Sequence, residues 1–321
     1  NLYAKGRYTE SKEPLTEVLT MNSMFDYANK AMGRAYLQEE DYGQALKFAE
    51  LSKDYDGYSD AFWEVRNIWL QNNLVPAFLL IVGLVVLWKI LGLVQKKKGV
   101  FTPVLQGIGR IGQIRLMGQL GYSGYFIKHP IDGCYGVRRE GKNSYLCANL
   151  ILAGFILLNV INKYFCGFLF KTVREGRYNL VSDIGSIVIV FLAVVICNYL
   201  VVTINEGEGS FRQVYCGFAY CLVPFLILEP FIILVSNVIT YNETFIVDFA
   251  NIFVVAWICV LVVVAVEEIN NYSIRETVKV ILLTLFTLLI MALIVFIVYM
   301  LFTQVINFIV TLVREAVYRF D

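Results

Sequence analysis

Six long apolar runs constrain the fold of this chain more than any other feature of its sequence. Each run has about 20 or more residues, the length that an α-helix needs to cross the ~30 Å hydrocarbon core of a bilayer. The runs are 74–94, 146–170, 182–203, 214–239, 246–266 and 279–303. Only 17% of residues are charged and 58% are hydrophobic, which excludes an ordinary soluble enzyme. The sequence predicts an all-α polytopic helical membrane bundle with a small soluble helical domain.

The distribution of charge predicts how the spans are oriented. Residues 95–144 carry 9 Lys/Arg and 2 Asp/Glu, whereas residues 1–73 carry 8 Lys/Arg and 12 Asp/Glu. Lys and Arg concentrate in cytoplasmic connections, so we place 95–144 inside and the N-terminal domain outside the cytoplasm of a bacterial, multi-pass membrane protein. The basic connection 171–177 weakens this bias without reversing it. Because the chain begins at Asn1, we expect it to be a fragment or a processed product.

Residues 1–73 show a period of 34 residues that is typical of tetratricopeptide repeats. Tyr8 and Tyr42 are 34 residues apart, each before a helical pattern. Gly, Tyr, small and Trp residues lie where such repeats place them, at Gly33, Tyr36, Ala45, Ala49 and Trp63. We expect the tail of one repeat, a full repeat over about 26–58 and the first helix of a third. Such repeats bind peptides or proteins on a concave surface; a plain helical stalk remains the alternative.

Residues 95–144 form the basic segment that follows the first span, 74–94. Apolar residues recur every three positions between Pro103 and Lys128, which predicts an amphipathic segment on the membrane surface, loosened by six glycines. The GxGxxG match at 107–112 has no preceding strand, so we reject it as a dinucleotide site. The tail, 303–321, is a second candidate interfacial helix. The main bundle is expected over 145–321.

The residue inventory argues against catalysis. The chain has one histidine, His129, and seven cysteines without a CxxC pair, which removes Ser/His/Asp and multi-histidine metal sites. No GxxxxGK[ST] motif occurs. We therefore expect no enzyme activity, no cofactor, no metal site and no nucleic-acid partner; the bilayer itself is an expected partner.

Glu229 lies near the middle of the run 214–239, next to Pro230 and downstream of Pro224. An acid at membrane depth is costly and indicates function by default, and each proline interrupts backbone hydrogen bonding. One interpretation is a proton or cation site, or a hinge. The other is a protonated glutamate bonded inside the bundle, near Asn159 or Asn198.

Two polar connections contain the remaining candidate residues. The connection 205–212 combines acids, glycines and an arginine, and 129–140 combines turn-forming residues with a basic pair. Neither makes a catalytic set, and a plain polar turn remains an alternative for the first. The candidate partner-binding residues are Glu206, Glu208, Ser210, Phe211, Arg212, His129, Asp132, Arg138 and Arg139.

These connections also carry a resemblance to a known family. His129-Pro-Ile-Asp-Gly-x-Tyr with Arg139-Glu140, Asn205-x-Gly-Glu-Gly-Ser-Phe-Arg212 with Tyr215, and Tyr220-x-x-x-Pro224 resemble the bacterial branch of the Yip membrane family, named for Rab-type GTPase interaction in eukaryotes. The resemblance covers roughly 100–321 and implies a five-span core, so the span 74–94 is an addition that carries the repeat domain.

The resemblance implies a non-enzymatic accessory or scaffold subunit. Bacterial relatives of this kind are typically met beside sugar-type ABC permease and solute-binding components, which become the expected partners of an importer complex. The alternative is a proton- or ion-coupled transporter of small solutes that uses Glu229. A transporter of that kind typically has paired broken helices, and the sequence shows only one strongly broken span.

Overall fold

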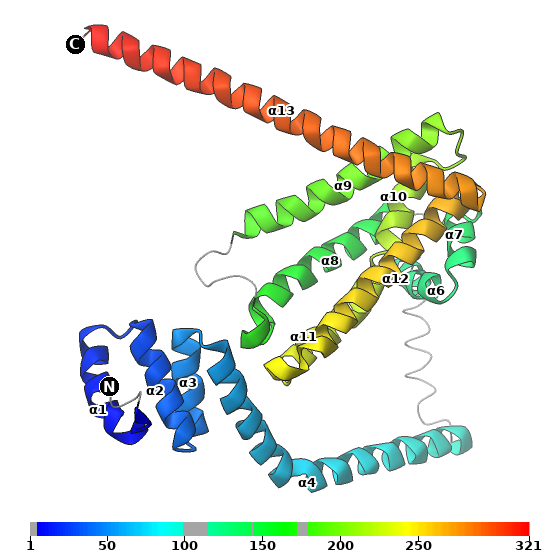
Figure 1. The fold of residues 1–321 in the computed structure, drawn as a ribbon. Coiled ribbons are helices and arrows are strands. Elements are labelled where there is room, and N and C mark those ends of the chain that lie inside the picture. Colours follow the sequence, from blue (N-terminus) through cyan, green and yellow to red (C-terminus); the bar gives the residue numbers. More distant parts are fainter. Residues whose placement is uncertain (1–4, 99–114, 143, 172–178, 321) are drawn as a thin grey trace. The chain divides into compact units, whose positions relative to one another are not determined.

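The computed structural model describes residues 5–98, 115–142, 144–171 and 179–320, and these residues form helices joined by turns, without strands (Figure 1). The N-terminal elements are α1 (Tyr8–Met21), α2 (Asp26–Gln38), α3 (Tyr42–Ser52) and α4 (Tyr55–Lys98). The later ones are α6 (Arg115–Lys128), α7 (Pro130–Arg139), α8 (Tyr145–Phe165), η2 (Phe168–Phe170), α9 (Leu180–Ile204), α10 (Phe211–Tyr220), α11 (Val223–Ser236), η3 (Tyr241–Glu243), α12 (Thr244–Asn270) and α13 (Ile274–Phe320).

Six segments of the described chain are long and apolar enough to cross a membrane. They are Tyr55–Ile90, Tyr145–Phe165, Leu180–Ile204, Phe211–Ser236, Tyr241–Asn270 and Ile274–Glu315. Each contains or overlaps one of the six apolar runs, so the predicted fold class, a polytopic helical membrane protein, is confirmed. The fourth segment is broken into α10 and α11 just before Pro224, whereas α11 continues through Pro230.

The chain forms two compact units, each made of three stretches of sequence. The first unit comprises Asn1–Gly118, Leu157–Tyr178 and Phe225–Ala256, and the second comprises Gln119–Ile156, Asn179–Pro224 and Trp257–Asp321. The helices α6, α8, α11 and α12 contribute residues to both units. Each unit is described by itself below.

In the first unit, α1 to α4 pack in sequence order, and small residues allow α2 and α3 to approach closely. A Cβ atom added to Gly33 would lie 3.2 Å from the backbone nitrogen of Ala49 and 3.4 Å from the carbonyl oxygen of Ala45. The ring of Tyr36 stacks on Phe48 at 5.5 Å. The helices α1 and α3 begin 34 residues apart, at Tyr8 and Tyr42, and membership of the tetratricopeptide repeat family stays a prediction.

The expected boundary at residue 73 is not a break in the structure. One 44-residue helix, α4, joins the N-terminal region to the first span. Pro76 lies inside this helix, and Figure 1 shows the helix bent along its length; proline is a common cause of such bends.

The tail is likewise not a separate helix, because α13 runs for 47 residues without interruption. Residues 280–313 of this helix contain no charged side chain. Its first half packs on α9 in the second unit, and its later apolar residues, such as Phe302 and Phe308, are exposed.

The basic segment is only partly described. Residues 99–114, which include the GxGxxG match and the first half of the predicted amphipathic segment, lie outside the described residues, as do 172–178. From Arg115 onward the predicted loosening by glycines is wrong, since Gly118, Gly121 and Gly124 lie within the continuous helix α6. That helix ends at Lys128, two residues before Pro130 starts α7.

Candidate functional site

The candidate site lies in the second unit, where α9 and α12 end in the same way. Each helix is followed by a residue in the left-handed region, Glu206 (φ 57°) after α9 and Asn271 (φ 60°) after α12. The next residue then donates its backbone N–H to a carbonyl five residues back, from Gly207 to Val202 and from Tyr272 to Glu267, each at 3.0 Å. This is the Schellman arrangement, which satisfies the last carbonyls of a helix.

The two helix ends hold each other in place. The Tyr272 hydroxyl lies 3.2 Å from the carbonyl oxygens of Val202 and of Asn205 and donates to this pair. A Cβ atom on Gly207 would lie 2.5 Å from that hydroxyl, and one on Gly209 would lie 2.3 Å from Oδ1 of Asn270. The glycines in the connection 205–212 therefore allow a close approach, and they do not make it loose.

Arg138 of α7 inserts its guanidinium at the end of α12. Its side chain is only 10% exposed, and its Nη1 donates to the carbonyl oxygen of Glu268 at 3.2 Å and to Oδ1 of Asn271 at 3.0 Å. Its Nη2 pairs with the carboxylate of Glu208. The negative end of the helix dipole favours a cation here.

Glu208 completes this cluster on the more exposed side. It accepts a hydrogen bond from Nδ2 of Asn271 at 3.2 Å, and Nη2 of Arg139 lies 3.8 Å away. The hydrogen bond from Arg138 lowers the pKa of Glu208 and outweighs the opposing effect of desolvation. Gln213 adds a further link, because its Nε2 donates to the carbonyl oxygen of Arg138 at 2.9 Å. We call Arg138, Arg139, Glu208, Gln213 and Asn271 the Arg138 network.

Three other candidate residues of the connection 205–212, Ser210, Phe211 and Arg212, lie at the start of α10. The backbone N–H of Ser210 donates to Oε1 of Gln213 at 2.8 Å, which caps the helix. Phe211 packs edge-on against Tyr199 at 5.3 Å. The guanidinium of Arg212 lies 5.2 Å from the ring centre of Tyr145, a cation–π contact. These side chains position α10 against its neighbours.

His129 and Asp132 do not join the Arg138 network. Both are exposed, His129 between α6 and α7 and Asp132 in the first turn of α7, and the His129 ring is tilted against the Tyr125 ring at 4.8 Å. The hydroxyl of the same tyrosine donates to Oδ2 of Asp132 at 3.4 Å. The candidate residues of the 129–140 connection are thus divided between two places, and only its basic pair meets the connection 205–212.

Glu229 lies in the first unit and is 1% exposed. Asn162 of α8 donates to its Oε1 at 2.6 Å, and its Oε2 has no hydrogen-bond partner among the described residues. The predicted enclosure in the bundle is therefore observed. The bonded asparagine lies about one turn beyond the expected Asn159, and Asn198 donates instead to Thr284 at 3.2 Å.

The described residues contain no group of three His, Cys, Asp or Glu side chains that could hold a metal ion. The Cys134 thiol lies buried in α7, and burial raises its pKa, so it is protonated at neutral pH and is a poor nucleophile. The Arg138 network contains a carboxylate and guanidinium groups but no base beside a nucleophile. Its geometry serves positioning and not bond-making.

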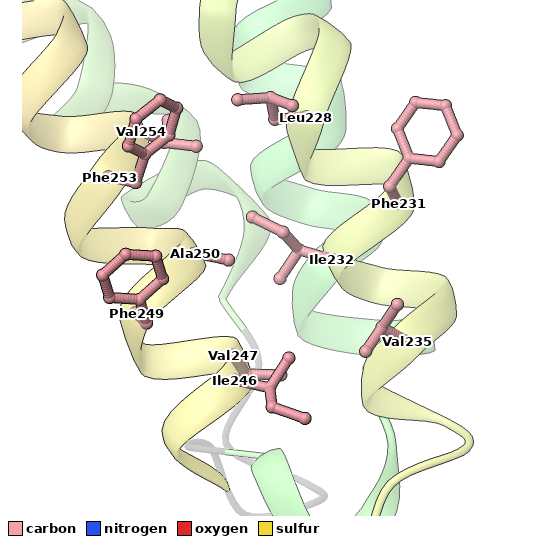
Figure 2. A pocket seen from close by; sticks show the side chains of 10 residues that line it. All are labelled: Leu228, Phe231, Ile232, Val235, Ile246, Val247, Phe249, Ala250, Phe253 and Val254. Atoms are coloured by element: carbon pink, nitrogen blue, oxygen red, sulfur yellow. The ribbon is translucent and has the colours of Figure 1, made fainter. Parts of the chain in front are cut away.

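An apolar groove of about 310 Å³ lies between α11 and α12 in the first unit. Figure 2 shows Leu228 and Ile232 extending from α11 toward α12. The other lining residues are equally apolar: Phe231, Val235, Ile246, Val247, Phe249, Ala250, Phe253 and Val254. A groove without a polar group, on two membrane-spanning helices, suits hydrocarbon and no polar ligand.

Sequence reasoning missed the uncharged members of the Arg138 network. Asn271 directly follows α12, and an asparagine just after a helix is a signal for a left-handed C-terminal residue. That signal was available in the sequence Glu267-Glu-Ile-Asn-Asn-Tyr272. Gln213 was available as the third residue after a capping serine.

Comparison with known protein families gives one match. Residues 135–313, more than half of the chain, match the Yip1 domain family. The match begins in α7, just before the basic pair, and includes the connection 205–212 and the end of α12. No curated protein and no solved structure matches the chain.

Proposed function

Since the chain belongs to the Yip1 domain family, we propose that it is a non-enzymatic membrane scaffold that presents a rigid polar patch to another membrane protein. One observation carries the proposal. The Arg138 network uses its buried groups to hold three helix ends, and it leaves Arg139 with 60% of its side chain exposed beside Glu208 at 51%. A fixed surface with both signs of charge favours protein recognition over chemistry.

The proposed partner class is the permease and solute-binding components of an ABC-type importer. The resemblance of the polar connections to bacterial relatives found beside such components supports this choice. In that complex the Arg138 network would face the permease, and the N-terminal region would face the binding protein.

We further propose that the membrane is the bacterial cytoplasmic membrane and that the N-terminal region lies outside. The excess of Lys and Arg in 95–144 supports this orientation. The connections between helices also fall into two groups, as expected if successive spans cross the membrane in opposite directions. The first unit joins the N-terminal region to the connections after α8 and after α11, through Tyr58 with Phe168 at 4.6 Å and Arg66 with Glu243 at 2.6 Å. The second unit joins the connections after α7, α9 and α12 around Arg138.

Co-purification of the complex from native membranes in mild detergent tests the proposal. Arg139→Glu should reduce the yield of permease chains severalfold, since it reverses an exposed charge while Arg138 keeps the fold. Glu208→Ala with Arg212→Ala should do the same. Lys128→Glu, an equal charge reversal at the end of α6, is the matched control. Unchanged yield in both variants, or a wild-type chain without any transporter partner, contradicts the proposal.

A transporter remains the competing proposal, and one observation favours it: the buried Oε2 of Glu229 lacks a hydrogen-bond partner among the described residues. A lone, enclosed acid at membrane depth is the type of group that proton-coupled transporters use. Uptake assays with Glu229→Gln separate the two proposals, as described below.

A further inference from the structure

The first unit contains a polar cleft that shares no residue with the Arg138 network. It has a volume of about 530 Å³. We call it the acidic cleft, and its lining residues are Leu37 of α2, Tyr42 of α3, Ser59, Asp60, Trp63 and Glu64 of α4, and Asn242 and Glu243 of η3. Two neighbouring stretches of the N-terminal helices and one distant stretch, 242–243, therefore build one concave surface.

Strong polar contacts hold the walls of the acidic cleft together. The guanidinium of Arg66 binds both carboxylate oxygens of Glu243, at 2.6 and 2.8 Å, and donates to the carbonyl oxygen of Val238 at 3.0 Å. The backbone N–H of Tyr241 donates to Oγ of Ser59, also at 3.0 Å. Such a two-fold ion pair fixes geometry, so the cleft is a built feature of this unit.

The charges that line the acidic cleft are not balanced. Three lining residues are acidic and none is basic. Arg66 neutralises Glu243, but no ion pair within the described part of the chain reaches Asp60 or Glu64. These two residues are four apart on α4, so their carboxylates share one face of the helix and stand beside the cavity.

Aromatic rings stand next to these carboxylates. Trp63, 41% exposed, and Tyr42 both line the acidic cleft. The Trp63 ring lies 4.8 Å from the guanidinium of Arg66, a cation–π contact within this wall. Carboxylates and indole rings together select cations, because both attract positive charge.

We propose that the acidic cleft binds an arginine or lysine side chain from an extended basic segment of another protein. Charge complementarity supports this occupant, since the whole stretch 1–73 has a net charge of −4. The open, concave surface on packed helix pairs suits a peptide. The proposal does not depend on the scaffold role of the Arg138 network.

Peptide binding to the full chain in phosphatidylcholine nanodiscs tests this site directly. The probe is a fluorescent seven-residue peptide of alternating glycine and arginine, and its control has citrulline, which is uncharged, in place of arginine. Fluorescence anisotropy should show affinity for the arginine peptide at least about tenfold above that for the citrulline peptide. Asp60→Asn with Glu64→Gln should remove most of this difference.

The matched control is Glu50→Gln with Asp56→Asn, which removes the same charge from exposed positions outside the cleft. This variant should bind the arginine peptide within about twofold of wild type. Circular dichroism and gel filtration establish that both variants are folded. Equal binding of both peptides, no binding, or equal loss in the two variants overturns the proposal. So does binding of calcium ions or spermidine, but not the arginine peptide, that depends on Asp60 and Glu64.

Discussion

Arg66 and Glu243 are 177 residues apart in sequence and form a doubly hydrogen-bonded ion pair within the first unit. The pair ties the N-terminal part of α4 to the short connection between α11 and α12. Their side chains are mostly buried, with 14% and 26% exposed. Neither charge has another partner of opposite sign among the described residues.

A double-mutant cycle should therefore show strong coupling between these two residues. We expect Arg66→Ala and Glu243→Ala each to lower thermal stability in nanodiscs, and the double variant to lose less than the sum of the two. The coupling should be about 1–3 kcal/mol, measured by calorimetry. Additive losses would show that the pair contributes nothing beyond its separate side chains.

The connection after α9 should respond in opposite directions to two substitutions. Glu206→Gly should stabilise the protein by about 0.5–1 kcal/mol, because glycine adopts the left-handed conformation without a steric cost. Gly207→Ala should destabilise by about 1–3 kcal/mol, because its Cβ would displace the Tyr272 hydroxyl. Gly185→Ala, where a Cβ meets nothing within 4 Å, is the control. The thermal unfolding of the three variants tests both expectations. If Gly207→Ala does not lower thermal stability, the close contact between the ends of α9 and α12 is contradicted.

Two replacements of Glu229 should separate the effect of its hydrogen bond from the effect of its ionisable group. Glu229→Gln keeps an oxygen that accepts from Asn162, so expression and assembly should stay nearly unchanged. Glu229→Leu leaves the Asn162 amide without its acceptor and should cost about 1–3 kcal/mol. Both effects are measurable by the thermal stability of the purified protein. If Glu229→Gln abolishes proton-dependent uptake while assembly is intact, the transporter proposal replaces the scaffold.

Asp54 should make the N-terminal helices sensitive to acid. This residue is 4% exposed and pairs with Lys30 and Arg34, each at 3.0 Å. Burial acts to raise its pKa, but the hydrogen bonds from Arg34 and Lys30 prevail and lower the pKa of Asp54 below 3.8.

Because the pKa of Asp54 is lower in the folded state, its stabilising effect is present above the unfolded pKa and is lost as pH falls through the folded one. Hydrogen–deuterium exchange of α2 and α3, corrected for the intrinsic rate, should accelerate below about pH 4. Asp54→Asn should exchange faster at pH 7 and show less further change on acidification. An acid response identical to that of wild type would exclude Asp54 as its source.

The proposed topology predicts which positions a membrane-impermeant thiol reagent can reach. In single-cysteine variants of intact cells, Asp60→Cys should be labelled from outside, because the N-terminal region is proposed to lie there. Glu140→Cys, next to the Arg138 network, should be labelled only after the membrane is opened. The reverse pattern would invert the protein while leaving its fold unchanged.

The sequence predicted the spans well because apolar length is a local property. The run 182–203 corresponds to the helix Leu180–Ile204, and Pro224 correctly indicated the break before α11. The uninterrupted helices α4 and α13 were not predicted. The polarity changes near residue 73 and after 303, but α4 continues through Pro76, and no proline or glycine lies between 303 and 320.

The Arg138 network could be predicted only in part. Arg138, Arg139 and Glu208 were identified as charged candidate residues in turn-rich connections. Asn271 lies 133 residues from Arg138, and no local pattern joins two such positions. Contacts of this kind depend on which distant parts of the chain meet in the fold. For the same reason, Asn162 could not be identified from the sequence as the partner of Glu229.

The uncharged stretch of α13 has a consequence for the membrane around this protein. Its 34 residues between Lys279 and Arg314 extend about 51 Å, whereas the hydrocarbon core is ~30 Å thick. Even at the ~40° upper limit of observed tilts, a crossing uses only about 26 residues. At least two turns of apolar helix therefore extend beyond the lipid tails, and they must find cover in thickened bilayer, in the headgroup layer or against another protein. The protein should accordingly favour thick membranes over thin ones.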